Sequence, residues 1–507
     1  MKLCFHKIDS LPRLSWCLRV SRHSEEVDVW HGPWVESRTN FFCEGAWNSD
    51  YGNEEIERAI LMGSGGRIDS DNLIIASPSH AMERLHLLRN RDYLFVSNSI
   101  VFLLCKAEDE PHPHSLRYKI VFASIIQGLK SYPRYLPTKN GNRIRLYNYC
   151  NLIINQRLEV IEQPKPAVKD FVDFQDYRDF LANQIAAIIS NARDSRRRVK
   201  YEPIVTISSG YDSPTCAVFA RENGCEQALT FVKARDTAGG IEDSGQQIAE
   251  RLGMAVTVID RRDYLQEAGF PEVEFYGTSN AMMYPLASRL EAKAVFTGHH
   301  GDAVWDRTYR KGCENFVRTG ASGNSLEEFR LRVGWIHMAV PFIGCTSYLS
   351  INKISQSLEM KPWSIGGWYD RPIPRRIVES AGIERILFGN EKRVAVVNPQ
   401  TEGSWDHWMT PESYQDFRTF CNEISRLRIA TQHKFIDAIR WLNESHAAWN
   451  DRITNRLARH FGIKVSLPCV IPRDLRLSGS RSTDERALLF QWSVAKLSSR
   501  YQCGSKK

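Results

Sequence analysis

The residues best suited to chemistry form a short polar segment that follows a β-branched run. Residues 203–207, Pro-Ile-Val-Thr-Ile, are typical of a buried strand, and residues 208–213, Ser-Ser-Gly-Tyr-Asp-Ser, lead from it into an apolar helical run. Such a strand, turn and helix N-terminus favour an anion, because backbone N–H groups and the helix dipole face the turn. The segment predicts a phosphate-binding loop in which Asp212 could hold Mg²⁺. An ordinary Ser/Gly turn that opens a helix is the alternative.

A second polar segment follows another predicted strand, residues 294–298. Residues 297–305 read Thr-Gly-His-His-Gly-Asp-Ala-Val-Trp. The carboxyl ends of parallel strands lie at one edge of a sheet, where ligands bind, so we expect the two segments to lie together. Asp212 and Asp302 could then share one Mg²⁺ on a pyrophosphate group. A glycine-rich surface loop with incidental histidines is the alternative, and the order and spacing of the two segments argue against it.

Both segments resemble signatures of the asparagine synthetase family. Residues 208–213 are similar to the pyrophosphate-loop signature Ser-Gly-Gly-x-Asp-Ser, with Ser209 in place of the first glycine, and they do not fit the Gly-Lys-Ser/Thr loop of other ATPases. Residues 297–305 resemble the family's second signature, Ser-Gly-Glu-Gly-x-Asp-Glu-x-Phe, with Gly298, Asp302 and Trp305 at matching positions. If the position of Ser209 requires a positive φ, serine is strained there.

Weaker matches run in the family's order and extend the resemblance over about residues 40–400. Residues 242–253 resemble its acidic-residue-then-helix segment. Residues 340–342 resemble its Val-Pro-Phe-Leu-Asp segment, although Gly344 follows where the acid is expected. Residues 375–392 resemble the stretch that ends in Arg-x-Lys and carries the catalytic lysine. Lys392 takes the position of that lysine, and Asn390 replaces the arginine.

The resemblance implies an ATP-dependent ligase with ATP and Mg²⁺ as cofactors. A substrate carboxylate attacks the α-phosphate, pyrophosphate leaves, and an amine or ammonia displaces AMP to form an amide. Asp212 and Asp302 would hold the metal ion, and Lys392 would stabilise charge that develops in either step. The residues implied in ATP binding are Ser208, Ser209, Gly210, Asp212, Ser213, Phe231, Val232 and Gly298, with Phe231 and Val232 at the adenine.

His299 is the candidate base for a protonated amine. It takes the signature position that is Glu in asparagine synthetase and Tyr in β-lactam synthetase, and imidazole titrates near neutral pH. Ala303 replaces the signature's second acid, as β-lactam synthetase also lacks one there. His299 and His300 could instead hydrogen-bond backbone groups in a loop. A metal site on this pair is disfavoured, because adjacent residues seldom point to one ion and no third ligand is evident.

The N-terminal region resembles the glutamine-hydrolysing domain of the same family. The segments at 42–47, 66–68 and 94–99 are similar to strands of that domain. Its nucleophile is a cysteine at the N-terminus, but residue 2 here is Lys2, and Cys4 and Cys17 are internal and cannot offer a free α-amine as base. We therefore expect a retained scaffold without glutaminase activity, as in β-lactam synthetase and some peptide cyclases of the superfamily.

The expected fold is α/β with three parts. Residues 1–165 form a β-rich, Ntn-like sandwich, residues 166–400 a parallel-sheet PP-loop ATP pyrophosphatase domain, and residues 401–507 a helical extension, with a linker at 162–166. Alternation and apolar runs predict strands at 72–76, 93–97, 150–154, 203–207, 229–232, 255–259 and 294–298. Helical spacing predicts helices at 177–189, 244–252, 414–429 and 434–442.

Composition limits the class of protein further. The net charge of +8 is mild for 507 residues, and the densest basic cluster, at 196–200, could be a solvated helix end or could help hold phosphates. The 12 cysteines include no CxxC pair and are expected to be reduced thiols. No signal peptide and no run of ~20 apolar residues is evident, so a cytoplasmic protein without a membrane partner is predicted.

The expected partners are a small-molecule or peptide carboxylate and an amine donor, and a homo-oligomer is left open. A nucleobase- or tRNA-modifying enzyme of the PP-loop class is one alternative, but its usual cysteine pairs and basic RNA-binding segment are absent from the sequence, so no nucleic-acid partner is expected. A non-catalytic ATP-binding scaffold is the other, because Ser209, Ala303 and Asn390 depart from the family pattern.

Overall fold

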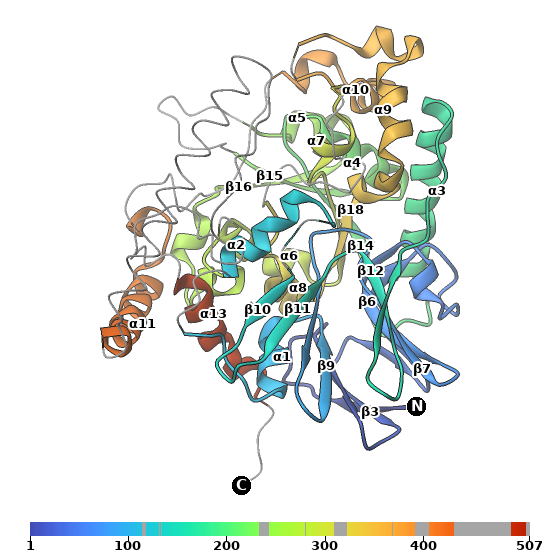
Figure 1. Ribbon diagram of the computed structural model, residues 1–507. Coiled ribbons are helices and arrows are strands. Elements are labelled where there is room, and N and C mark those ends of the chain that lie inside the picture. The colour runs from blue at the N-terminus through green and yellow to red at the C-terminus, as the bar shows by residue number, and fades with distance from the viewer. Residues whose placement is uncertain are drawn as a thin grey trace, which may run out of the picture.

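The computed structural model describes residues 1–113, 118–130, 132, 134–232, 243–278, 280–308, 322–367, 369–390, 405–429 and 488–502. In this part the chain is mixed α/β and contains three sheets (Figure 1). The first third forms two sheets, and a five-stranded parallel sheet follows. The predicted α/β class with a parallel sheet is therefore confirmed.

Residues 1–164, called the front domain below, form two sheets that lie face to face. One has the order β1-β3-β2-β9-β8-β11-β10 and the other β13-β12-β7-β6-β5-β4. The strands are β1 Lys2–Lys7, β2 Trp16–Ser21, β3 Glu26–His31, β4 Glu36–Arg38, β5 Phe41–Trp47, β6 Leu61–Asp69, β7 Asn72–Ala76, β8 Leu85–Arg89, β9 Tyr93–Ser97, β10 Tyr135–Pro137, β11 Arg143–Tyr147, β12 Cys150–Ile154 and β13 Val160–Pro164. Apolar side chains from both sheets, including Leu18, Val29, Phe42 and Ile75, form the core between them.

Short helices close this sandwich. They are η1 Ile56–Arg58, α1 Ile100–Lys106, α2 Tyr118–Ala123 and η2 Ser124–Gln127. Ser99 caps α1, since its side chain accepts a hydrogen bond from the backbone N–H of Phe102. The helix α3, Phe174–Ala192, packs on β5 and is capped by Asp173, so β5 is buried on both faces.

The parallel sheet has the order β16-β15-β14-β17-β18. Its strands are β14 Glu202–Thr206, β15 Gln227–Phe231, β16 Ala255–Ile259, β17 Lys293–Thr297 and β18 Ile336–Ala339. The chain runs outward from β14 to β16 and then returns to β17 on the other side. The strand order therefore reverses between β14 and β17, which is where ligands bind in open α/β sheets.

Helices and single turns surround this sheet. The helices are α4 Asp212–Glu222, α5 Gln246–Arg251, α6 Ala287–Leu290, α7 Gly301–Val304, α8 Glu327–Val333, α9 Tyr348–Gln356 and α10 Pro372–Ser380. The turns are η3 Asp263–Gln266, η4 Pro271–Phe275, η5 Ala281–Leu286, η7 Val340–Phe342, η8 Cys345–Ser347, η9 Leu358–Trp363 and η10 Arg385–Leu387.

The C-terminal part contributes η11 Trp405–His407, α11 Pro411–Ile429, α13 Leu489–Leu497 and η14 Ser498–Arg500, while the helix expected at 434–442 lies outside the described residues. The α13–η14 segment returns to both domains. The ring of Tyr501 stacks on Phe102 of the front domain, and its hydroxyl donates to Glu328 of α8 at 2.5 Å.

The structure corrects the expected bounds of the linker and one expected role of the basic cluster. The predicted linker at 162–166 begins as strand β13, because residues 160–164 pair with β12, and the irregular connection runs from 165 to 173. Lys165 is buried there and donates to the carbonyl of Ser77, and burial lowers the pKa of Lys165 to about 7.

The basic cluster at 196–200 joins the domains. Arg197 donates to the carbonyl of Gly45 at 2.9 Å, and Arg198 donates to the hydroxyl of Ser37 at 2.8 Å. The cluster precedes β14, whereas the predicted phosphate loop follows it, so these side chains lie at the opposite end of the strand. A phosphate-holding role for the cluster is not supported.

A buried ion network spans the same interface. Arg330 of α8 donates to both carboxylate oxygens of Glu44 at 2.8 and 3.0 Å and lies 2.7 Å from the carboxylate of Glu83. All three side chains are almost fully buried. Burial raises the pKa of Glu83 to about 7, against the opposing effect of Arg330. The guanidinium thus compensates two carboxylates that have little access to water.

Arg330→Leu should destabilise the protein strongly. It leaves Glu44 and Glu83 buried without their cation, which costs about 3–5 kcal/mol of unfolding free energy. Urea denaturation measures this, with Arg58→Ala as the control, because Arg58 pairs with Glu55 on an exposed surface. A midpoint for Arg330→Leu that matches the control would contradict a compensating role.

Candidate functional site

The two segments singled out in the sequence lie directly against each other. Residues 208–213 follow β14 and residues 298–302 follow β17, its neighbour in the sheet. A Cβ on Gly298 would lie 2.6 Å from the backbone nitrogen of Ser213, and one on Gly301 would lie 2.6 Å from Oδ1 of Asp212. Only glycine allows this approach, so the missing side chains bring the two turns together.

The first turn is held by its own hydroxyl groups. The backbone N–H of Ser208 donates to Oγ of Ser213 at 2.9 Å, and the two hydroxyls are 3.0 Å apart. Ser209 Oγ donates to Asp243 Oδ1 at 2.8 Å, which ties the loop to the start of α5. Ser209 does not adopt a positive φ, so the strain considered from the sequence does not arise there.

Asp212 opens α4 and is paired with Arg371, a residue that the sequence did not single out. Nη1 of Arg371 lies 2.6 Å from each carboxylate oxygen of Asp212. Burial of the guanidinium would lower the pKa of Arg371, but Asp212, Tyr369 and Asp302 raise it, and the net shift is upward. The side chain therefore places a permanent positive charge beside Asp212 and within the electrostatic reach of Asp302.

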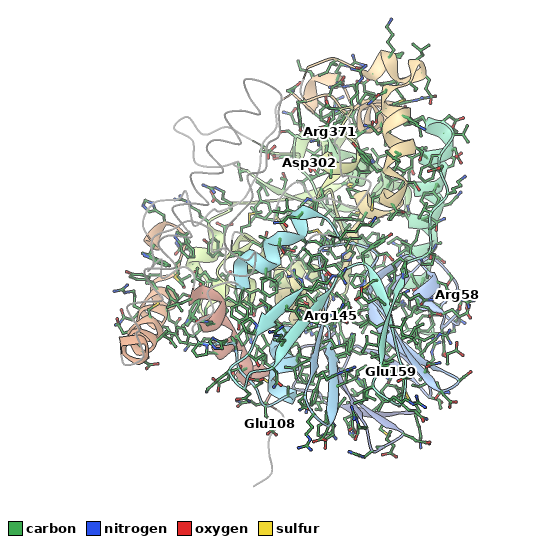
Figure 2. The ribbon with its side chains drawn as sticks, in the orientation of Figure 1. Arg58, Glu108, Arg145, Glu159, Asp302 and Arg371 are labelled. Carbon is green, nitrogen blue, oxygen red and sulfur yellow. The ribbon has the colours of Figure 1, made fainter. Side chains whose placement is uncertain are left out.

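Asp302 comes to the same place from the second turn. His300 adopts a left-handed conformation, φ 66°, and turns the chain so that α7 begins at Gly301. Asp302 is buried, and Figure 2 labels it close to Arg371, on which its charge acts. The site thus combines two carboxylates and one guanidinium at the end of the sheet.

The donor set suits Mg²⁺ bound together with phosphates. Among the described residues, no group of three or more His, Cys, Asp and Glu side chains could enclose a metal ion. Mg²⁺ commonly takes one or two protein carboxylates and completes its octahedron with phosphate oxygens and water. Asp212 and Asp302 match that requirement, so the residues present fit the ion.

A short loop positions Arg371. The carboxylate of Asp370 accepts hydrogen bonds from the backbone N–H groups of Ile365 at 3.2 Å and Gly366 at 3.1 Å. Pro372 then starts α10 directly after Arg371. The hydrogen bonds of Asp370 hold the chain before Arg371, and α10 holds the chain after it. These two constraints fix the position of the guanidinium.

Aromatic rings cover the same region. The rings of Tyr211 and Tyr369 lie 4.9 Å apart, and Arg375 donates to the hydroxyl of Tyr211. The backbone N–H of Gly389 donates to the carbonyl of Ser209 at 2.9 Å. Residues 389–390 therefore reach the first turn, while Lys392, the expected catalytic lysine, lies outside the described residues.

The residues expected at adenine lie beside the first turn. Phe231 is buried at the end of β15. Val232 follows it and donates its backbone N–H to the carbonyl of Ile259 at 3.0 Å. Asp243 links Val232 to the loop, because its backbone N–H donates to the carbonyl of Val232 and its carboxylate accepts from Ser209.

The two histidines of the second turn take different environments. His300 Nε2 lies 3.2 Å from the carbonyl of Ser322. The ring of His299 meets the ring of His337 edge-on, with centroids 5.6 Å apart. His299 is half-buried, so it is the more accessible of the two.

The thiols considered for glutaminase chemistry are not activated. Cys17 is fully buried in β2, and burial raises its pKa. The pKa of Cys4 in the edge strand β1 is also raised, first by its partial burial. A thiolate nucleophile needs a lowered thiol pKa. No disulfide joins the nine cysteines in the described part of the chain.

Comparison with known proteins adds no assignment. No protein-family model matches the chain, and no curated protein matches it. Of the helices that the structure describes, none combines the length and apolar character needed to cross a membrane.

Gly301→Ala should destabilise the site. The new methyl group would overlap the carboxyl of Asp212, which Arg371 holds in place, and such overpacking typically costs about 1–3 kcal/mol. Chemical denaturation should show a lower midpoint at an unchanged slope. Gly52→Ala is the matched control, because its methyl group would meet the exposed side chain of Asp50, which can move. Equal midpoints would contradict the tight packing of the two turns.

Proposed function

We propose that this protein is an ATP-dependent carbon–nitrogen ligase that forms an acyl-adenylate, similar to the asparagine synthetase family. The observation that carries the proposal is the meeting of the turns after β14 and β17, with Asp212, Asp302 and Arg371 between them. Polyphosphate binding needs hydroxyls, a cation and carboxylates that can hold a metal ion, and residues of these types meet here at the N-terminus of α4.

In the first step a substrate carboxylate oxygen attacks the α-phosphorus of ATP, and pyrophosphate leaves. The turn at 208–213 would hold the pyrophosphate through backbone N–H groups and the hydroxyls of Ser208 and Ser213. Mg²⁺ held by Asp212 and Asp302 would neutralise phosphate charge and orient the leaving group. Arg371 would add a fixed positive charge, and Lys392 would act on the same charge from the segment after Gly389.

In the second step an amine nitrogen attacks the acyl carbon of the adenylate, and AMP leaves with the electrons of the broken C–O bond. The nitrogen loses a proton as the amide forms. His299 would take that proton, since it follows Gly298 at the edge of the site and its ring is half-buried. The front sandwich would be of the Ntn type without glutaminase activity, and the raised pKa values of the Cys4 and Cys17 thiols fit a ligase that receives its amine from outside.

AMP and pyrophosphate are the products that test this function. The purified chain, with ATP and Mg²⁺, is incubated against pools of carboxylates and amines. Product formation with a particular pool is expected, and Asp212→Ala should abolish it. Asp9→Ala is the control, because Asp9 pairs with Lys7 on the surface. Formation of ADP and phosphate would overturn the assignment of the loop.

Arg371→Ala should reduce the adenylation rate by about 10²–10³-fold, the usual effect of losing one preorganised charge or donor. Arg371→Lys should recover part of that rate, because it keeps the charge and loses the two-point contact with Asp212. ATP binding without turnover in the wild-type protein, abolished by Asp212→Ala, would favour a non-catalytic nucleotide-binding protein instead.

A further inference from the structure

A buried loop of the front domain extends toward the segment beside His299. Residues 77–84 connect β7 to β8, and every one of them is buried. Ser79 fixes the start of the loop, since its hydroxyl accepts from the backbone N–H of Leu61 at 2.9 Å. Arg84 fixes its end by donating to the carbonyl of Asn324 at 2.8 Å. The loop is therefore held at both ends by the rest of the protein.

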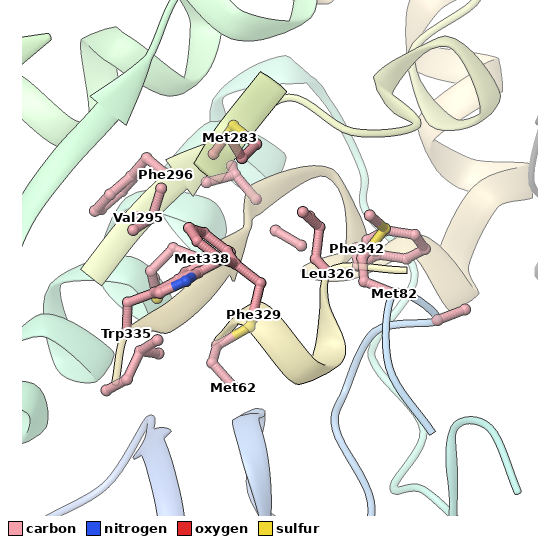
Figure 3. Packing of buried hydrophobic residues seen from close by; sticks show 14 of the residues in the cluster. Met62, Met82, Met283, Val295, Phe296, Leu326, Phe329, Trp335, Met338 and Phe342 are labelled. Atoms are coloured by element: carbon pink, nitrogen blue, oxygen red, sulfur yellow. The ribbon is translucent and has the colours of Figure 1, made fainter. Parts of the chain in front are cut away.

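The loop packs against Gly323, which also lies beside His299. A Cβ on Gly323 would overlap the terminal methyl group of Met82 and would lie 3.1 Å from Cδ2 of His299, so both side chains approach the same glycine. Met82 belongs to the same buried cluster as Leu326 and Phe342 (Figure 3). The candidate base and a residue of the front domain thus lie beside the same glycine.

A line of polar groups connects the loop to His299. Glu83 accepts from Arg330, and its other oxygen lies 3.9 Å from Nδ1 of His337. Nε2 of His337 lies 2.8 Å from the hydroxyl of Thr297, the last residue of β17.

These groups have little contact with water. Glu83, His337 and Thr297 are each exposed by 4% or less. In such an environment, charges and dipoles act on one another more strongly than in water. Glu83 and Thr297 therefore act strongly on the His337 ring, together with the rings of His80 and Trp335 that pack against it.

The Glu83 carboxylate lies 3.9 Å from Nδ1 of His337, beyond hydrogen-bond distance, so its charge acts on the position of the ring proton through space. An ionised Glu83 favours the proton on Nδ1, which leaves Nε2 to accept from the hydroxyl of Thr297. The ring of His337 meets the ring of His299 edge-on at 82°, so a change in the proton position on His337 alters the electrostatic environment of His299.

We propose that the front domain completes the ligase site, with Glu83 acting through His337 as a positioning residue for His299. The role of His299 as a base rests on the function proposed above. The arrangement of the side chains does not, and it can be tested without a substrate. The proposal also gives the front domain a task other than glutamine hydrolysis.

The test is ¹⁵N NMR of the full chain labelled at histidine, with resonances assigned through His299→Gln and His337→Gln. Spectra are taken above the pKa of about 7 that Glu83 has in the fold. Glu83→Gln should move the proton of His337 from Nδ1 to Nε2, because the amide N–H₂ then faces Nδ1. The ring resonances of His299 should shift with it.

Glu57→Gln is the matched control, because Glu57 is also a buried acid of the front domain and pairs with Arg67. It should leave the resonances of His299 and His337 unchanged. Unchanged His299 resonances in a folded Glu83→Gln variant would overturn the proposal. If only the AMP assay failed, the proposed function would be wrong, but the effect of Glu83 on His299 measured by NMR would still hold.

Two further measurements keep the proposal testable if Glu83→Gln does not fold. Thr297→Val removes the hydroxyl at Nε2 of His337 and leaves the Glu83–Arg330 pair intact, so it should shift His299, whereas Thr297→Ser should not. In the wild-type protein, ring protons of His299 and His337 should show a mutual nuclear Overhauser effect. Its absence would overturn the contact on which the proposal depends.

Discussion

The close approach of two turns, at Gly298 and Gly301 on one side and Asp212 on the other, is the constraint on which the site depends. Side chains at the two glycines would separate β17 from the first turn of α4. With the turns in contact, the carboxylates of Asp212 and Asp302 both act on Arg371, which carries the opposite charge. Arg371 supplies this charge from a third segment, so a steric fact about two glycines determines where a buried cation is needed.

Local patterns in the sequence predicted the parallel sheet apart from β18, together with several strands of the N-terminal sheets and the helices α3, α5 and α11. The strands predicted at 72–76, 93–97 and 150–154 match β7, β9 and β12, and those of the parallel sheet match β14 to β17 within about two residues. The strand β18 was not predicted, because His337 interrupts its short apolar run. A buried polar residue breaks the hydrophobic pattern from which a strand is predicted. In β18 that residue is His337, which is part of the proposed site.

The site itself was predictable only where a residue stands in a recognisable turn. Asp212 and Asp302 follow strands, and parallel topology brings them together. Arg371 and Tyr369 belong to an irregular segment without period, and the partners Arg371 and Asp212 are 159 residues apart in the chain. Glu83 comes from another domain. Such contacts depend on the packing of whole elements, and no local pattern of residue types marks them.

The buried ion network of Arg330, Glu44 and Glu83 gives the front domain a structural role at the interface. Burying Arg330 with two carboxylates stabilises less than apolar packing of the same volume would, and it requires every partner to be in place. Such a network favours one position of the front domain, because a shift of that domain would leave a buried charge without its partner. Glu83 belongs both to this network and to the line of groups that reaches His299. The ion pair that fixes the register of the two domains therefore also fixes the position of Glu83 relative to the site, which couples the fold of one domain to the chemistry proposed for the other.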